Sequence, residues 1–210
     1  MPDRFFRIEA RSIIKGGWGD YGDILQHGMT SHLPREGDLL ALERTGPFIP
    51  PITFPGIGDV VLTSGAKDLL QSSGLSGFDV RPVRKILTVE LHWENWDWSA
   101  EEPEQYPDSG EPEDYILGQP DSPSASAALG DLWELYVPDT ARILRPRQIV
   151  EDYEELKLDL ATYDGNDLIR SSDFGSILFT ERAKDWFTEH WSKYVEFLEF
   201  PTTESSDVAT

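Results

Sequence analysis

The segment GDVVLTSGAKDLL at residues 58–70 recurs without gaps as GSILFTERAKDWF at residues 175–187. Five of the 13 aligned positions are identical, and the apolar positions match as well. At the same offset of 117 residues, the tripeptide at 78–80 falls on the tripeptide at 195–197. This internal repeat decides the expected fold, because each copy carries the pattern of a strand, a helix and a second strand.

Each copy predicts the same local structure. Short apolar strands are expected at 60–62 and 177–179. Thr63 and Thr180 follow them at the position of a helix N-cap, where a hydroxyl accepts a hydrogen bond from a free backbone N–H. Apolar residues then recur at three- and four-residue spacing, so each short helix is expected to bury one face. These residues are Ala66, Leu69 and Leu70 in the first copy and Ala183, Trp186 and Phe187 in the second.

A second strand completes the pattern after each helix. Gly74 and Gly77 are expected to end the first helix before a strand at 78–81. The second helix is expected to end near 190–193, before a strand at 194–200. Two such copies can pack around a pseudo-twofold axis, or each can belong to a separate half of the molecule.

Further strands are expected where apolar residues cluster or alternate, at 5–14, 39–42, 84–93, 132–137, 141–144 and 156–160. The sequence therefore predicts an α+β fold with mixed or antiparallel sheets, short helices and a duplicated strand–helix–strand unit. We expect one domain over residues 1–200, built from two related halves at about 1–93 and 128–200. An acidic loop is expected at 94–127, and a disordered tail at 201–210.

The composition excludes several classes of protein. The 210 residues suffice for a buried core, and the 11% of aromatic residues argues against a disordered chain. The absence of cysteine excludes disulfides, thiolate zinc sites and a cysteine nucleophile. No segment reaches the roughly 20 apolar residues of a membrane helix, and the N-terminus lacks the apolar stretch of a signal peptide. We therefore expect a cytoplasmic protein.

The formal net charge is −21, from 39 acidic and 18 basic residues. Nucleic acids and anionic membranes attract basic surfaces, so neither is an expected partner. Between Lys85 and Arg142, 56 residues contain 14 carboxylates and no lysine or arginine. Such a block is expected to remain extended and solvated unless a cation or a basic partner neutralises it.

Tryptophans stand at the start of this acidic block. The alternating segment 84–93 predicts a half-buried strand that leads into Glu94-Asn95-Trp96-Asp97-Trp98. Rigid aromatic side chains within a charged rim are typical of protein–protein interfaces. Alternatively, the tryptophans cap the edge of the core and the loop has no function. The candidate partner-binding residues are Glu90, Trp93, Glu94, Trp96, Asp97, Trp98, Glu101, Glu102 and Glu104.

No motif predicts catalysis or a cofactor. The four histidines form no metal-binding signature, and no DxDxDG calcium loop occurs. The stretch GGWG at 16–19 lacks the residues of a phosphate-binding loop and predicts a turn. Residues 64–67 match the SxxK nucleophile pattern, but the repeat has Glu181 in place of Ser64, so Lys67 is expected to belong to the scaffold. We therefore expect a non-enzyme with no catalytic residues, no metal and no cofactor.

Two segments resemble bacterial immunity proteins of polymorphic and contact-dependent toxin systems. The first runs from GDLLALERTGPFIPP at 37–51 through RPV at 81–83, and the second from DLIRSSDFG at 167–175 through TERA at 180–183. In these segments, less than half of the chain, the sequence is most similar to the double-CxxCG immunity family, although it lacks the cysteines that name this family. The resemblance implies a cytoplasmic antitoxin that binds a cognate toxin and blocks it.

The charge and the resemblance favour the same function. A toxin such as a basic nuclease presents a cationic cleft that a carboxylate-rich surface can occlude. The main hypothesis is therefore an immunity protein that binds and neutralises a bacterial toxin, and a homodimer is compatible with it. The alternatives are an acidic adaptor or nucleic-acid mimic without a toxin partner and, more remotely, a carboxylate-based hydrolase.

Overall fold

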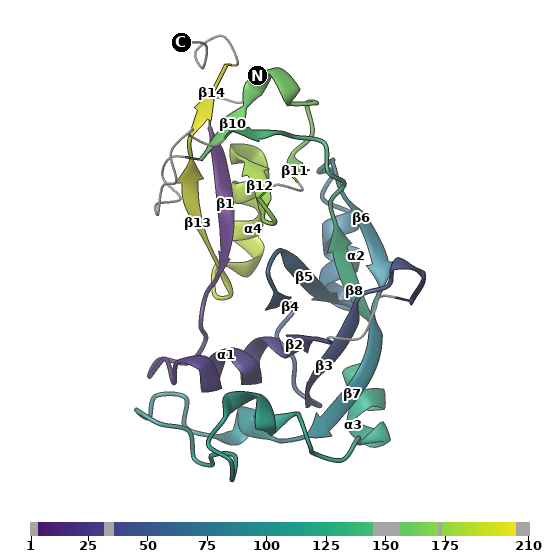
Figure 1. Ribbon diagram of the computed structural model, residues 1–210, viewed down its shortest axis with the longest axis vertical. Coiled ribbons are helices and arrows are strands. Elements are labelled where there is room, and N and C mark those ends of the chain that lie inside the picture. The colour runs from purple at the N-terminus through teal and green to yellow at the C-terminus, as the bar shows by residue number, and fades with distance from the viewer. Residues whose placement is uncertain (1–3, 32–35, 145–155, 172–173, 205–210) are drawn as a thin grey trace. The chain divides into compact units, whose positions relative to one another are not determined.

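The computed structural model describes residues 4–31, 36–144, 156–171 and 174–204 (Figure 1). These residues form an α+β fold, as the sequence predicts, with short helices and strands that pair into mixed and antiparallel sheets. The α-helices are α1 (Asp20–His27), α2 (Ser64–Gln71), α3 (Pro123–Leu129) and α4 (Glu181–Trp191). None of the helices in these ranges has the length and apolar character that a membrane span requires.

The chain divides into two compact units, each made of several stretches of sequence. Unit 1 combines residues 1–9, 70–79 and 136–210, and unit 2 combines residues 10–69 and 80–135. Each unit contains one four-stranded and one three-stranded sheet.

The two four-stranded sheets have the same strand order. In unit 2 the order is β4 (Ile52–Gly56), β5 (Asp59–Thr63), β8 (Leu132–Tyr136) and β6 (Asp79–Pro82). In unit 1 the order is β11 (Leu168–Arg170), β12 (Ile177–Thr180), β1 (Phe5–Ala10) and β13 (Val195–Phe200). In both sheets the strand that precedes the helix has antiparallel partners on both sides.

The register of these sheets is also the same. Leu62 of β5 pairs with Trp133 of β8. Phe179 of β12, which is 117 residues later than Leu62, pairs with Phe6 of β1. Since one register fixes which side chains share a face, Phe6 and Trp133 occupy equivalent positions in the two units.

The three-stranded sheets repeat one pattern too. In unit 2 the order is β2 (Met29–Thr30), β3 (Ala41–Gly46) and β7 (Arg84–Glu90). In unit 1 it is β9 (Ile143–Leu144), β10 (Lys157–Asp159) and β14 (Thr202–Thr203). In each sheet the middle strand is antiparallel to the first and parallel to the last.

In the described residues, the duplication therefore covers seven strands and one helix in each copy. The first copy comprises β1 to β7 with α2, and the second comprises β8 to β14 with α4. The two copies exchange their opening strands, because β1 lies in a sheet of unit 1 and β8 in a sheet of unit 2. Phe5 accordingly belongs to the core of unit 1 and Leu132 to the core of unit 2. For this reason the compact units differ from contiguous halves at about 1–93 and 128–200.

The predicted repeat is confirmed at its helix starts. The Thr180 hydroxyl accepts from the backbone N–H of Ala183 at 3.4 Å, and the Thr63 hydroxyl accepts from that of Ala66 at the same distance. The apolar faces are buried largely as expected, but Leu69 is 39% exposed, because it lies beside the buried face instead of on it.

Several strand boundaries differ from the expected ones. The first strand ends at Ala10 and not at residue 14, and β7 ends at Glu90 and not at residue 93. Thr88 is buried although the alternation predicts an exposed face, because the backbone around it contacts the segment before α3. The expected disordered tail is wrong for Thr202–Thr203, which forms β14, and residues 205–210 of that tail lie outside the described residues.

Candidate functional site

Two segments of unit 2 extend the duplicated scaffold. Residues 11–28, which contain α1, separate β1 from β2, whereas only residues 137–142 separate β8 from β9. Residues 91–131 join the first copy to the second and contain the acidic loop (94–127). The two segments pack against each other, with α1 beside the helical turn η3 (Pro112–Tyr115). The parts of unit 2 that the repeat does not explain thus lie together.

The acidic loop is folded, so the prediction that it stays extended is wrong. It includes part of the turn η2 (Trp93–Asn95), and all of η3 and most of α3. The ring of Trp96 lies 6.0 Å from that of Trp18 and 6.2 Å from that of Tyr115. The ring of Tyr21 lies 5.0 Å from that of Tyr106. Burial of Trp18, Trp96 and Tyr115 opposes the mutual repulsion of the carboxylates.

Backbone contacts fasten the loop to the glycine-rich stretch at 16–19. The N–H groups of Lys15 and Gly16 donate to the carbonyl oxygen of Trp98 at 2.9 and 3.3 Å. The indole N–H of Trp18 donates to the carbonyl oxygen of Ala100 at 2.9 Å. A Cβ atom on Gly16 would lie 2.0 Å from that same carbonyl oxygen, so only glycine fits. The turn predicted from this stretch is confirmed, and it docks the acidic loop.

The structure corrects the placement of two predicted contact residues. Trp93 is fully buried and packs against Phe48 and Trp98, with ring centres 5.1 and 5.5 Å away. Trp96 keeps only 9% of its surface exposed. These two side chains therefore serve as the core of the loop instead of a contact surface. Trp98 is half-buried, and its indole N–H donates to the carbonyl oxygen of Trp93 at 3.1 Å.

The predicted carboxylates are mostly at the surface. Eight of the ten carboxylates in the acidic loop are exposed, including Asp97, Glu101, Glu102 and Glu104. Glu104 accepts from the backbone N–H of Asp97 at 3.1 Å, which holds these two residues together. The hydroxyl and backbone N–H of Ser99 donate to Asp97 at 2.6 and 3.0 Å and lower the pKa of its carboxyl group.

Glu90 and Glu94 flank an exposed histidine just before the loop. The Nδ1 atom of His92 lies 2.9 Å from Glu94, and its Nε2 atom lies 3.6 Å from Glu90. These carboxylates raise the pKa of His92, mainly through the hydrogen bond with Glu94. The hydroxyl of Ser122 donates to Glu90 at 2.9 Å and is the main cause of the lowered pKa of Glu90.

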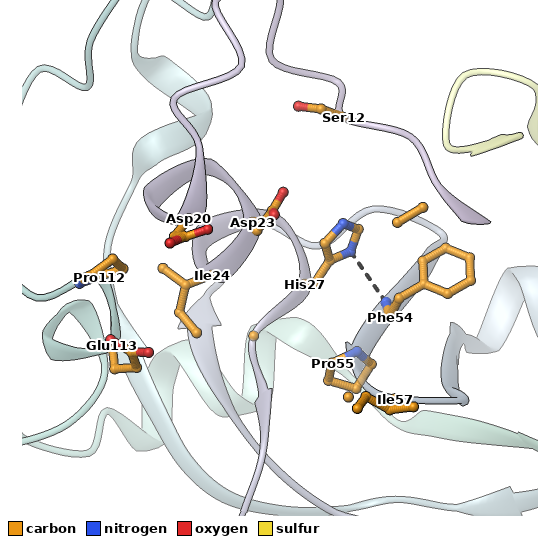
Figure 2. Close-up of a pocket in the computed structure, with 13 residues that line it drawn as sticks. Ser12, Asp20, Asp23, Ile24, His27, Phe54, Pro55, Ile57, Pro112 and Glu113 are labelled. Carbon is orange, nitrogen blue, oxygen red and sulfur yellow. Dashed lines mark hydrogen bonds between the residues drawn. The ribbon is translucent and has the colours of Figure 1, made fainter. Parts of the chain in front are cut away.

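A hollow of about 530 Å³ lies between α1, the β4–β5 hairpin and η3 (Figure 2). One face of α1 lines it, because Asp20, Asp23, Ile24 and His27 recur at three- and four-residue spacing. The hairpin contributes Phe54, Pro55 and Ile57, and η3 contributes Pro112 and Glu113. The walls thus combine three carboxylates with apolar and aromatic surface.

His27 gives this hollow a fixed hydrogen-bond donor. The backbone N–H of Phe54 donates to Nδ1 of His27 at 3.2 Å. Nδ1 is therefore unprotonated, and the proton of the neutral ring is assigned to Nε2. Burial, and then the positive charge of Arg44, lower the pKa of His27 to about 4. In Figure 2 the second ring nitrogen is turned away from Phe54, on the side of Ser12.

No family model matches the chain, and no curated protein is significantly similar to it. The resemblance to immunity proteins therefore stays a prediction. Among the residues that the structure describes, no group of three or more His, Asp and Glu side chains is placed to hold a metal ion.

The hollow is the part of the site that sequence reasoning missed. The spacing of Asp20, Asp23 and His27 on one helical face was the available signal, but the glycines at 16, 17, 19 and 22 favour a turn. The sequence also indicates that Ile57 is exposed, because Gly56 and Gly58 on either side of it are typical of a tight hairpin turn.

Proposed function

We propose that this chain is a cytoplasmic immunity protein that binds and occludes a basic bacterial toxin and performs no reaction of its own. The observation that carries the proposal is the acidic loop, a folded segment with eight exposed carboxylates and no lysine or arginine. The residues that resemble immunity proteins support the same function.

The electrostatics support recognition of a cationic protein. A net charge of −21 repels nucleic acids and anionic membranes and attracts basic surfaces. Charge complementarity of this kind raises association rates by about 10- to 1,000-fold at low ionic strength. The loop is also held in place by its buried rings, so binding costs little ordering entropy.

The proposed contact surface consists of the candidate residues whose side chains are accessible. Asp97, Glu101, Glu102 and Glu104 are exposed, and Trp98 keeps part of its ring accessible. Glu90 extends the negative surface beyond the loop. In the proposed complex these side chains form a charged patch around one aromatic residue, and the buried Trp93 and Trp96 support it from beneath.

The proposal predicts that a gene next to this protein's gene encodes the toxin, and the test is protection against the product of that gene. The triple variant Glu101→Lys, Glu102→Lys, Glu104→Lys reverses three exposed charges of the acidic loop. A matched control, Glu189→Lys, Glu196→Lys, Glu204→Lys, makes the same change in net charge on exposed residues of unit 1. We expect the first variant to lose co-purification with the toxin and protection of growing cells, and the control to retain both.

Two outcomes would contradict the proposal. Equal protection by the triple variant and the control would reject the acidic loop as the contact surface. A neighbouring gene product that binds this protein but harms no cell would reject the immunity function and favour an acidic adaptor.

A further inference from the structure

Three carboxylates line the hollow beside α1, and the positive charge of the buried Arg44 acts on it only through His27. Asp20 and Asp23 lie on the helix face that lines it, and Glu113 reaches it from η3. The lining residues include no lysine or arginine. No lysine or arginine of the described residues forms an ion pair with Asp23, and burial, and then the negative charge of Asp20, raise the pKa of its carboxyl group.

A second observation, independent of these carboxylates, points to a ligand. The side chain of His27 is more than nine-tenths buried and lines the hollow. Its Nδ1 atom is occupied by the Phe54 N–H, and in the described part of the chain no residue accepts a hydrogen bond from Nε2–H. The Nε2 atom keeps contact with solvent in the hollow, so its N–H can donate to an acceptor atom of a ligand. The hollow therefore offers a ligand three exposed carboxylates and one N–H donor.

The rim of the hollow exposes one large apolar side chain. Ile57, at the tip of the β4–β5 hairpin, is 91% exposed, the highest value among the exposed large hydrophobic residues that the structure describes. Gly56 and Gly58 flank it, so its side chain stands alone at the turn. Contact with apolar surface of a partner would remove this side chain from water, which is favourable.

We infer that this hollow receives an arginine side chain of a protein partner, whose neighbouring apolar surface covers Ile57. The inference rests on the proposed function only in taking the partner to be a basic protein. A guanidinium group fits because it is planar, presents several donors to the two aspartates, and stacks on rings such as Phe54. The partner's backbone carbonyl would accept from Nε2–H of His27.

The chemistry can be tested without the toxin. The probe is the capped peptide acetyl-Leu-Arg-Gly-amide, titrated into the full chain while backbone amide shifts are followed by NMR. Peptides with citrulline or lysine in place of arginine serve as ligand controls, since citrulline keeps the shape of arginine without its charge. We expect saturable shifts at Ile24, Phe54 and Ile57 with the arginine peptide, and weaker binding of both analogues.

Variants of the protein locate the binding. We expect Asp20→Asn with Asp23→Asn to weaken binding of the arginine peptide about tenfold, the loss typical of a charge-assisted hydrogen bond. The double variant Glu189→Gln, Glu196→Gln removes the same charge from exposed residues of unit 1 and should bind as the wild type does. Ile57→Ser changes an exposed turn residue, so it preserves folding and should weaken binding about threefold through lost apolar contact.

The results separate this inference from the proposed function. Absent shifts, shifts spread along the acidic loop, or unchanged binding by the Asp20/Asp23 variant would overturn the arginine site. Equal binding of the lysine peptide would overturn the choice of arginine. The triple variant of Glu101, Glu102 and Glu104 should still bind the peptide, so loss of toxin protection with intact peptide binding would concern the acidic loop alone.

Discussion

Lys67 and Lys184, which are 117 residues apart, make the same contact in the two units. The ammonium of Lys67 lies 4.4 Å from the ring centre of Trp133, and that of Lys184 lies 4.6 Å from the ring centre of Phe6. Each lysine also pairs with the aspartate that follows it, at 2.8 and 3.0 Å. The lysine that the repeat preserves thus connects each helix to the strand that comes from the other copy.

These contacts predict two measurable coupling energies. In double-mutant cycles for urea unfolding, Lys67→Met with Trp133→Leu and Lys184→Met with Phe6→Leu should each give a favourable coupling of about 0.5–1 kcal/mol. The tryptophan pair should give the larger value, because indole has the stronger quadrupole. A coupling energy of zero in either unit would show that the lysine–ring contact does not stabilise that unit.

The helix caps predict unequal losses of stability. Thr63→Ala should lower the free energy of unfolding by about 1 kcal/mol, the usual effect of removing an N-cap hydroxyl. Thr180→Ala should cost about 2 kcal/mol, because the Thr180 hydroxyl also donates to the buried carboxylate of Asp167 at 3.2 Å. Thermal and urea unfolding measure both, and replacement by serine should restore most of the loss. Equal losses at the two sites would contradict the role of Asp167.

The contact between Gly16 and the acidic loop can be tested by substitution. Gly16→Ala should displace the loop, because its Cβ would meet the carbonyl oxygen of Ala100. The expected result is a shift of tryptophan emission to longer wavelength and faster proteolytic cleavage within 94–127. Gly65→Ala is the matched control, since a Cβ at Gly65 meets nothing within 4 Å. Similar spectra and cleavage for both variants would contradict the docking contact.

His27 predicts a dependence of stability on pH. Its pKa is about 4 in the folded protein, below the ordinary value of 6.5, because burial and Arg44 disfavour the charged ring. The unfolded chain therefore binds the proton first, and stability that is fully present above pH 6.5 is lost as the pH falls to about 4. The loss amounts to about 3 kcal/mol. The measurement is urea unfolding of the wild type and of His27→Gln at pH 7 and pH 4. Carboxylates contribute equally to both proteins, so the difference between them reports on His27. An equal loss of stability in both proteins would exclude His27 as the cause.

The sequence predicts those parts of the fold that depend on residues close together in the chain. The strands around Leu62 and Phe179 and the caps at Thr63 and Thr180 follow from short-range spacing, which an internal repeat makes visible twice. Strand pairing was not predictable in the same way. The opening strands, residues 5–10 and 132–137, share no identical residue in their equivalent register and lie 127 rather than 117 residues apart. Their partners are set by tertiary packing, which no local pattern encodes.

The candidate site was predicted in part for a related reason. The exposed carboxylates follow from composition, since a run of acidic residues has to reach solvent. The burial of Trp93 and Trp96 does not follow from composition, because an aromatic residue beside charged residues is found both in interfaces and in small cores. The hollow requires α1, the hairpin and η3 to meet, and residues 20, 57 and 113 are far apart in sequence.

The exchange of opening strands has a consequence for biosynthesis. Phe5 in β1 pairs with Thr180 in β12, so β1 has no partner in its sheet until the second copy has been made. Such distant pairing slows folding. A truncated chain that ends after the first copy would leave the gap between β5 and β6 unfilled, exposing strand edges that invite association with other chains. Unit 1 therefore cannot close until β11, β12 and β13 have been made, whereas unit 2 can close as soon as β8 has been made.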